Sequence, residues 1–150
     1  ALLVSLEKEE LKRRVQSYLK QVPGASGGNN HMGSSFTQDR SAMHAVLKEL
    51  QDSDFFFIDS RTIGSSVAFD EARRMGMRTA QRNVFLDNEK NVQYISNQLK
   101  KLIKIAEDKG TAVAICHPYS QTFDALRQNE SWLKEQGVDF VLASRLVKRY

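Results

Sequence analysis

The sequence predicts an α/β fold in which parallel strands alternate with amphipathic helices. Three observations support this prediction: short apolar runs of strand length recur along the chain, a polar turn follows each run, and a segment of helical periodicity follows most of these turns. Strands that alternate with helices form right-handed βαβ units around a parallel sheet. The chain has 150 residues, 41% of them hydrophobic, and it contains no repeat or low-complexity linker. Residues 1–150 are therefore expected to form a single domain.

The first half of the chain alternates between helical and extended patterns. In chain order the expected elements are a helix over 5–21, an extended piece over 25–28, a helix over 38–51, a strand over 55–59, a helix over 66–75 and a strand over 77–82. Leu11, Val15 and Leu19 fall at helical spacing, and Pro23 stops that helix. The run from Phe55 is apolar without alternation, which is typical of a parallel strand buried on both faces.

The second half of the chain repeats this alternation. The expected elements are a helix over 91–109, a strand over 112–116, a helix over 121–136, a last strand over 139–142 and a short basic helix at the end. Ile95, Leu99 and Ile103 belong to the apolar stripe of the longest helix, and Gly110 is placed as its C-terminal cap. Cys116 belongs to an apolar run and is expected to be a buried thiol.

Composition narrows the possible classes of protein. The net charge is +4, and the basic residues sit on helix-like segments without interleaved aromatic residues, so they indicate solvated helix faces and no nucleic-acid partner. The longest apolar runs are about five residues, far short of the ~20 that a membrane-spanning helix needs. A single cysteine excludes a disulfide framework and a multi-cysteine zinc site within the chain.

Polar residues follow the carboxyl end of each expected strand. In parallel α/β sheets and barrels these loops share one face, where ligands bind. We therefore expect the loop side chains to converge there, with His31 and His117 over a common pocket. The side chains concerned are Asn30, His31, Asp59, Arg61, Arg82, Asp87, His117 and Tyr119.

Each candidate residue has a functional and a structural interpretation. His31 lies in an Asn- and Gly-containing turn and could bind a metal, or it could bond turn carbonyls. His117 precedes a proline at a strand end, where it could transfer a proton or cap a loop. Asp59 ends an apolar strand, and it could orient a catalytic group or hold the loops together. Asp87 could belong to the site or to a turn before a helix. His44, within a helix, is expected to be structural or exposed.

Nucleotide and serine-hydrolase motifs are not found. The sequence contains no G-x-G-x-x-G, and the glycine spacing from Gly28 to Gly33 has Ser34 at the position of the P-loop lysine. No serine lies in a G-x-S-x-G elbow. These observations argue against dinucleotide binding, phosphate transfer by a P-loop and serine nucleophilic catalysis.

Several blocks of sequence together resemble the divergent polysaccharide deacetylases, which are relatives of the NodB-type carbohydrate esterases. These blocks are NNHMGSSFT (29–37), FFFIDSRT (55–62), RNVFLDN (82–88) and AICHPYSQT (114–122). The resemblance implies that the chain is the C-terminal part of a deformed (β/α) barrel of about seven strands. A strand ending in an Asp-Asp pair opens the family's domain and is not present here. A possible upstream segment would therefore complete the barrel, and without it the chain is expected to be inactive.

The resemblance also implies a function and a place in the cell. The expected protein is an exported, periplasmic or cell-envelope hydrolase. It would use a divalent metal ion, with zinc as the expected ion, to remove N-acetyl groups from a polysaccharide or cell-envelope glycan. The alternative is a non-catalytic exported module of the same fold that binds a glycan or a protein partner.

The same resemblance assigns roles to matching positions. His31 resembles the histidine beside the metal, and His117 resembles the histidine that protonates the leaving amine. Asp59 and Arg61 resemble the loop that orients catalytic groups. A last set is expected to contact the substrate. It consists of Asn30, Arg82, Asp87 and Tyr119. Many relatives are expected to carry a histidine at the position of Tyr119.

Overall fold

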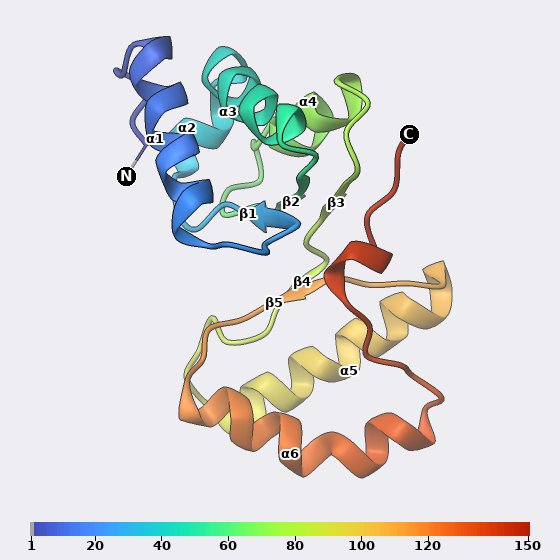
Figure 1. Cartoon of the computed structure of the whole chain (residues 1–150). Helices are drawn as coiled ribbons and strands as arrows, with labels where there is room; N and C mark the ends of the chain where they lie inside the picture. Colours follow the sequence, from blue (N-terminus) through green and yellow to red (C-terminus); the bar gives the residue numbers. More distant parts are fainter. Residues whose placement is uncertain (1) are drawn as a thin grey trace. The chain divides into compact units, whose positions relative to one another are not determined.

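Parallel strands alternate with helices in the computed structural model, which describes residues 2–150 (Figure 1). The chain divides into two units, each with its own core. Unit 1 contains the chain up to Gln81 together with Val147–Tyr150, and unit 2 contains Arg82–Leu146. The mixed α/β class with parallel strands is thus confirmed. The barrel of about seven strands and the single domain stay predictions.

The sheet of unit 1 has three parallel strands in the order β1-β2-β3. They are β1 (Gly27–Asn29), β2 (Phe56–Asp59) and β3 (Thr79–Gln81). Asn29 lies opposite Ile58, and Asp59 lies opposite Gln81, so the three strands end at one edge of the sheet. Every residue of β2 is buried, as the continuous apolar run predicts for a central strand.

Among the described residues, four helices belong to unit 1. They are α1 (Lys8–Gln21), α2 (Ser34–Gln38), α3 (Arg40–Asp52) and α4 (Ala68–Arg74). The core joins Leu11 and Val15 of α1 to Leu47 of α3, Ala72 of α4 and Phe57 of β2. These side chains are almost fully buried, and α1 and α3 are amphipathic helices that contribute their apolar faces to this core.

The last residues of the chain pack on unit 1. Lys148 forms an antiparallel bridge with Thr79 of β3, through backbone hydrogen bonds of 2.9 and 3.1 Å. The ring of Tyr150 contacts Phe69 edge to face at 5.7 Å and lies 4.6 Å from the guanidinium carbon of Arg73.

Unit 2 is built from two short parallel strands and two long helices. They are β4 (Val84–Phe85), α5 (Val92–Lys109), β5 (Ala114–Ile115) and α6 (Ser120–Glu135). Figure 1 shows α5 and α6 side by side, with Ile95, Leu99 and Ala125 in the core that they share. The side chain of Asn91 caps α5, and Gly110 ends it in the left-handed conformation, as expected.

Several sequence expectations need correction. The predicted strand over 139–142 is wrong, because this segment pairs with no strand among the described residues, and Phe140 and Leu142 are exposed. The basic helix after it is only a 3-10 turn, η1 (Ala143–Arg145). Cys116 is exposed, so the expected burial of its thiol is also wrong. Partial burial, and then the charge of Asp87, still raise its pKa.

Within residues 2–150, the helices fall short of the length and apolar character that crossing a bilayer requires.

Candidate active-site residues

The loops that follow β1 and β2 are joined by two asparagines. Asn30 accepts a hydrogen bond at Oδ1 from the backbone N–H of Ser60, and Asn29 donates from Nδ2 to Ser60 Oγ, both at 2.8 Å. Thr62 donates to the carbonyl of Met32 at 3.3 Å. Parallel pairing of β1 and β2 brings these loops to one edge of the sheet, and the asparagines then hold them in register.

His31 lies exposed in the first of these loops. Met32 and Gly33, which follow it, both have left-handed backbone conformations, with φ of 56° and 73°. This turn connects β1 to α2. A metal-binding role for His31 stays a prediction.

Asp59 is buried at the end of β2 and is surrounded by hydrogen-bond donors. Its Oδ1 accepts from the backbone N–H of Arg61 at 2.8 Å. Its Oδ2 accepts from Ser66 Oγ at 2.8 Å and from the backbone N–H of Phe69 at 3.3 Å. A buried carboxylate needs such donors. These contacts match the loop-holding interpretation of Asp59, and its role toward a catalytic group stays a prediction.

Arg61 connects the same loop to the neighbouring strand. Its backbone has a positive φ of 44°, which a residue with a Cβ adopts only at some cost in free energy. Its Nη1 donates to Gln81 Oε1 at the end of β3, and its Nη2 donates to the carbonyl of Gly64, both at 2.8 Å. Arg61 thereby fixes the loop that Asp59 also holds.

Asp87 and His117 form the most complete contact among the predicted residues. The Asp87 side chain is fully buried, and its Oδ1 lies 3.1 Å from His117 Nδ1. Its Oδ2 accepts from the backbone N–H of His117 and, at 2.9 Å, from Thr122 Oγ1 in α6. The sequence also allowed Asp87 to be part of a turn at the start of the next helix. The residue that caps this helix, α5, is Asn91, and Asp87 contacts His117 and Thr122. The His117 side chain is 32% exposed, so its ring faces solvent beside a buried carboxylate.

Aromatic rings surround the imidazole of His117. Tyr119 stacks on it with ring centroids 5.0 Å apart, and Phe85 lies tilted at 5.5 Å. Lys90 Nζ lies 4.0 Å from the centroid of Tyr119, and the guanidinium of Arg82 lies 5.6 Å from that of Phe85. All four predicted residues of unit 2 thus belong to one cluster.

Sequence reasoning missed three members of this cluster: Phe85, Lys90 and Thr122. Thr122 lies in the first turn of α6, five positions after His117, and its hydroxyl is buried against Asp87. A polar residue, Thr122, on the apolar face of the first helical turn was the signal in the sequence that could have pointed to a buried hydrogen-bond partner. The cation–ring contact of Lys90 has no comparable signal in the sequence.

The predicted residues divide between the two units. Asn30, His31, Asp59 and Arg61 belong to unit 1, and the cluster around His117 belongs to unit 2. The expectation that His31 and His117 share one pocket stays a prediction. Among residues 2–150, no three His, Cys, Asp or Glu side chains gather closely enough to hold a metal ion. The described residues therefore do not by themselves fit a metal ion.

Comparison with known proteins identifies the family. The model of the family described as divergent polysaccharide deacetylase matches residues 1–147. The chain belongs to this family. The chain is 36% identical over 123 residues to the uncharacterized protein YibQ of Escherichia coli, and 37% identical over 126 residues to an uncharacterized protein of Haemophilus influenzae. These matches cover 82% and 84% of the chain but 39% and 45% of the relatives, so the chain spans less than half of either relative.

A solved structure shares the fold of this chain. The crystal structure of an uncharacterized protein from Agrobacterium tumefaciens superposes with a TM-score of 0.93, at 21% identity. The match covers 97% of the chain and 59% of that structure. At this level of identity the likeness concerns the fold alone.

Proposed function

We propose that the protein is a hydrolase that removes N-acetyl groups from a polysaccharide or cell-envelope glycan, and that His117 protonates the leaving amine. Family membership supports the reaction class. The observation that carries the proposal is the contact of the buried Asp87 carboxylate with both the backbone N–H and the Nδ1 of His117. A deacetylase needs a proton donor for nitrogen, and this pair has the chemistry of one.

The geometry explains how His117 would act. With Nδ1–H donated to Asp87, the ring is held in one tautomer, and Nε2 becomes the atom that exchanges a proton. Stacking on Tyr119 orients the ring plane beside Asp87. In the reaction, water gives one proton to a base and adds to the acetyl carbonyl, the departing nitrogen takes the proton from Nε2, and the C–N bond breaks. The proton held by the base then returns to Nε2 through solvent. Acetate and the free amine are the products.

The remaining parts of the proposal concern the whole protein. The barrel of about seven strands, the divalent metal with His31 among its ligands, the glycan partner and the exported location all belong to it. So do the orienting roles of Asp59 and Arg61, and the substrate contacts of Asn30, Arg82, Asp87 and Tyr119. Family membership is their support.

The test is acetate release from an N-acetylated oligosaccharide by the protein expressed from its full-length gene. His117→Ala is expected to lower kcat by about 10²- to 10⁴-fold, the usual contribution of a general acid. Bound metal, measured by elemental analysis, should stay unchanged. His44→Gln is the matched control, because His44 lies on α3 outside the cluster, and it should keep turnover within about twofold of the wild type.

Three results would contradict the proposal. Full turnover by His117→Ala would remove the proton-transfer role. Loss of metal in this variant would make His117 a ligand. Binding of the oligosaccharide without any release of acetate by the wild type would favour the alternative, a non-catalytic module that binds glycan.

A further inference from the structure

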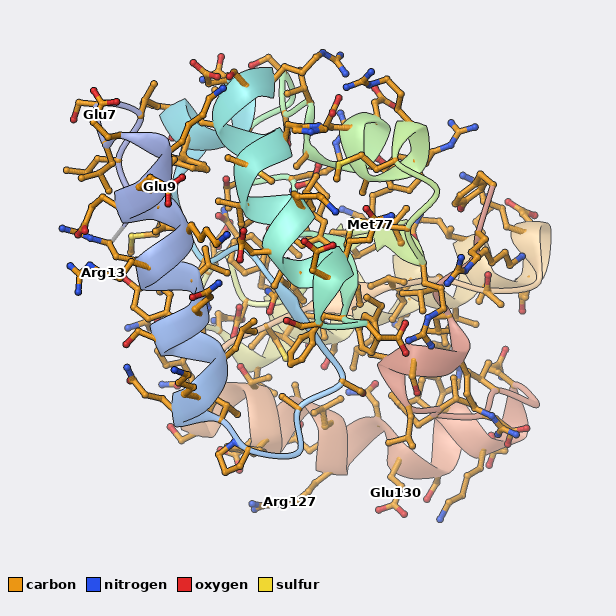
Figure 2. The ribbon with its side chains drawn as sticks, turned by 45° about the horizontal axis from the view of Figure 1, so that its top comes forward. Glu7, Glu9, Arg13, Met77, Arg127 and Glu130 are labelled. Carbon is orange, nitrogen blue, oxygen red and sulfur yellow. The ribbon has the colours of Figure 1, made fainter. Side chains whose placement is uncertain are left out.

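A groove lined mostly by charged side chains lies on unit 1, between α1, α3 and the end of α4. It encloses about 600 Å³, within the range typical of small-ligand sites. Figure 2 shows α1 beside α3, with Arg13 pointing away from α3 and so outside this groove. The lining side chains are Lys8, Glu9, Lys12, Arg40, Ser41, His44, Ala45, Lys48, Glu49 and Arg74. None of them belongs to the site proposed above.

Positive charge dominates the lining of the groove. It carries five Lys and Arg side chains against two Glu, in addition to His44. Two of the cations already have acidic partners on the surface: Lys12 lies 3.8 Å from Glu49, and Lys48 contacts Asp52. Glu9 lies next to Lys8 on α1, and the two arginines share the buried Glu71, so the excess of positive charge lies at the wall that carries Arg40 and Arg74.

A buried carboxylate underlies the second wall. The Glu71 side chain is fully buried in α4, and its partners are three side chains that open on the groove. Its Oε2 accepts from Arg40 Nη1 at 2.8 Å and from Arg74 Nε at 3.0 Å. Its Oε1 accepts from Arg74 Nη2 at 2.6 Å and lies 2.8 Å from His44 Nδ1. One negative charge thus gathers two guanidinium groups and an imidazole at one end of the groove.

This arrangement holds donors in place for a ligand. A guanidinium has five N–H donors, and Glu71 uses one from Arg40 and two from Arg74. Both arginine side chains are more than half exposed, so their remaining donors are open to the groove. Side chains fixed by a buried partner lose less conformational entropy on binding than free ones do.

We propose that this groove binds a phosphate-bearing ligand. Arginine donors match phosphate oxygens in pairs, and lysine supplies a point charge. A phosphate has tetrahedral oxygens and about two negative charges at neutral pH, so its oxygens can accept from the guanidinium groups of Arg40 and Arg74 and from the ammonium group of Lys8, which all line the groove. The phosphate belongs either to a soluble molecule or to a lipid headgroup.

Titration calorimetry with inorganic pyrophosphate tests the proposal on the protein from its full-length gene. The wild type is expected to bind pyrophosphate, and Arg40→Gln and the double variant Lys8→Gln/Lys12→Gln are each expected to weaken binding at least about fivefold. Lys20→Gln removes one charge from α1 outside the lining and should leave binding within about twofold. The α1 variants remove exposed lysines, so they keep the test valid if Arg40→Gln fails to fold.

Sedimentation with phosphatidylcholine vesicles, with and without phosphatidylglycerol, separates the two sources of phosphate. The groove binds a lipid headgroup if the protein sediments only with vesicles that contain phosphatidylglycerol and if the double lysine variant no longer does so. Pyrophosphate binding without sedimentation assigns it to a soluble phosphate. The proposal is overturned if the wild type binds neither, or if Lys20→Gln weakens binding as much as the groove variants do. Deacetylase activity is independent of each of these results.

Discussion

Replacing Glu71 with glutamine should destabilise unit 1 strongly. The variant keeps the shape of the side chain but removes the charge that Arg40, His44 and Arg74 share. The hydrogen bond from Arg74, with smaller contributions from His44 and Arg40, lowers the pKa of Glu71 from 4.5 to about 2 against the opposing effect of burial. A depression of this size corresponds to about 3 kcal/mol of stabilisation at neutral pH. That is a large part of the stability of an ordinary domain.

The pH dependence of this stabilisation follows from the direction of the pKa change. The folded-state pKa of Glu71 lies below its unfolded value, so the contribution is complete above the unfolded pKa of about 4.5. It is lost as the pH falls through the folded pKa of about 2. About 2 kcal/mol of it should already be gone at pH 3. Glu71→Gln cannot titrate at this position, so the difference between the two proteins should narrow from pH 7 to pH 3.

Urea denaturation followed by far-ultraviolet circular dichroism measures both effects. The matched control is Glu130→Gln on α6. Glu130 forms an exposed ion pair with Lys134, and such pairs contribute little to stability, so we expect no change in the urea midpoint. Figure 2 shows Glu130 at the outer side of α6. Equal midpoints for the wild type and Glu71→Gln at pH 7 would refute the reasoning. So would a difference between them that stays constant down to pH 3.

Two further predictions concern local structure. An alanine Cβ at Gly27 would lie 2.4 Å from ring atoms of Phe56, so Gly27→Ala should lower the free energy of unfolding by about 1–3 kcal/mol in a denaturation experiment. Gly28→Ala is the control and should cost far less, because a Cβ there would have nothing within 4 Å. Similar losses from both variants would contradict the packing argument. Asn91→Ala removes the acceptor for the Tyr94 backbone N–H and should lower the free energy of unfolding by about 1 kcal/mol. The loss should be seen as faster amide hydrogen exchange in the first turn of α5. Unchanged exchange there would show that the cap contributes nothing.

Local patterns predicted the longer elements well. The apolar stripe through Leu99 identified α5, and the unbroken run from Phe56 identified β2 as a central parallel strand. The helix α2 was missed because five residues are too few for a helical period. The segment 139–142 has the composition of a strand but no neighbour to pair with among the described residues, and composition alone does not supply a partner.

The candidate site was predicted less completely, because its contacts join distant parts of the chain. The sequence pattern placed Asp87 and His117 in loops at strand ends, but not in contact with each other across 30 positions. For Asp59 it left two alternatives, and the donors around the carboxylate, which match the loop-holding interpretation, are seen only in the structure. Glu71 gave no signal at all, because an acidic residue in a short helix is usually solvated.

Val147–Tyr150 belong to unit 1, and this has a practical consequence for the design of fragments of the protein. A fragment that stops at Gln81 would lose the backbone pairing of Thr79 with Lys148 and the ring of Tyr150 beside Phe69. The outer side of β3 would then be an open strand edge, which invites pairing between copies and aggregation. Producing this half of the molecule separately therefore calls for grafting the final four residues onto it through a designed connection or adding them as a peptide.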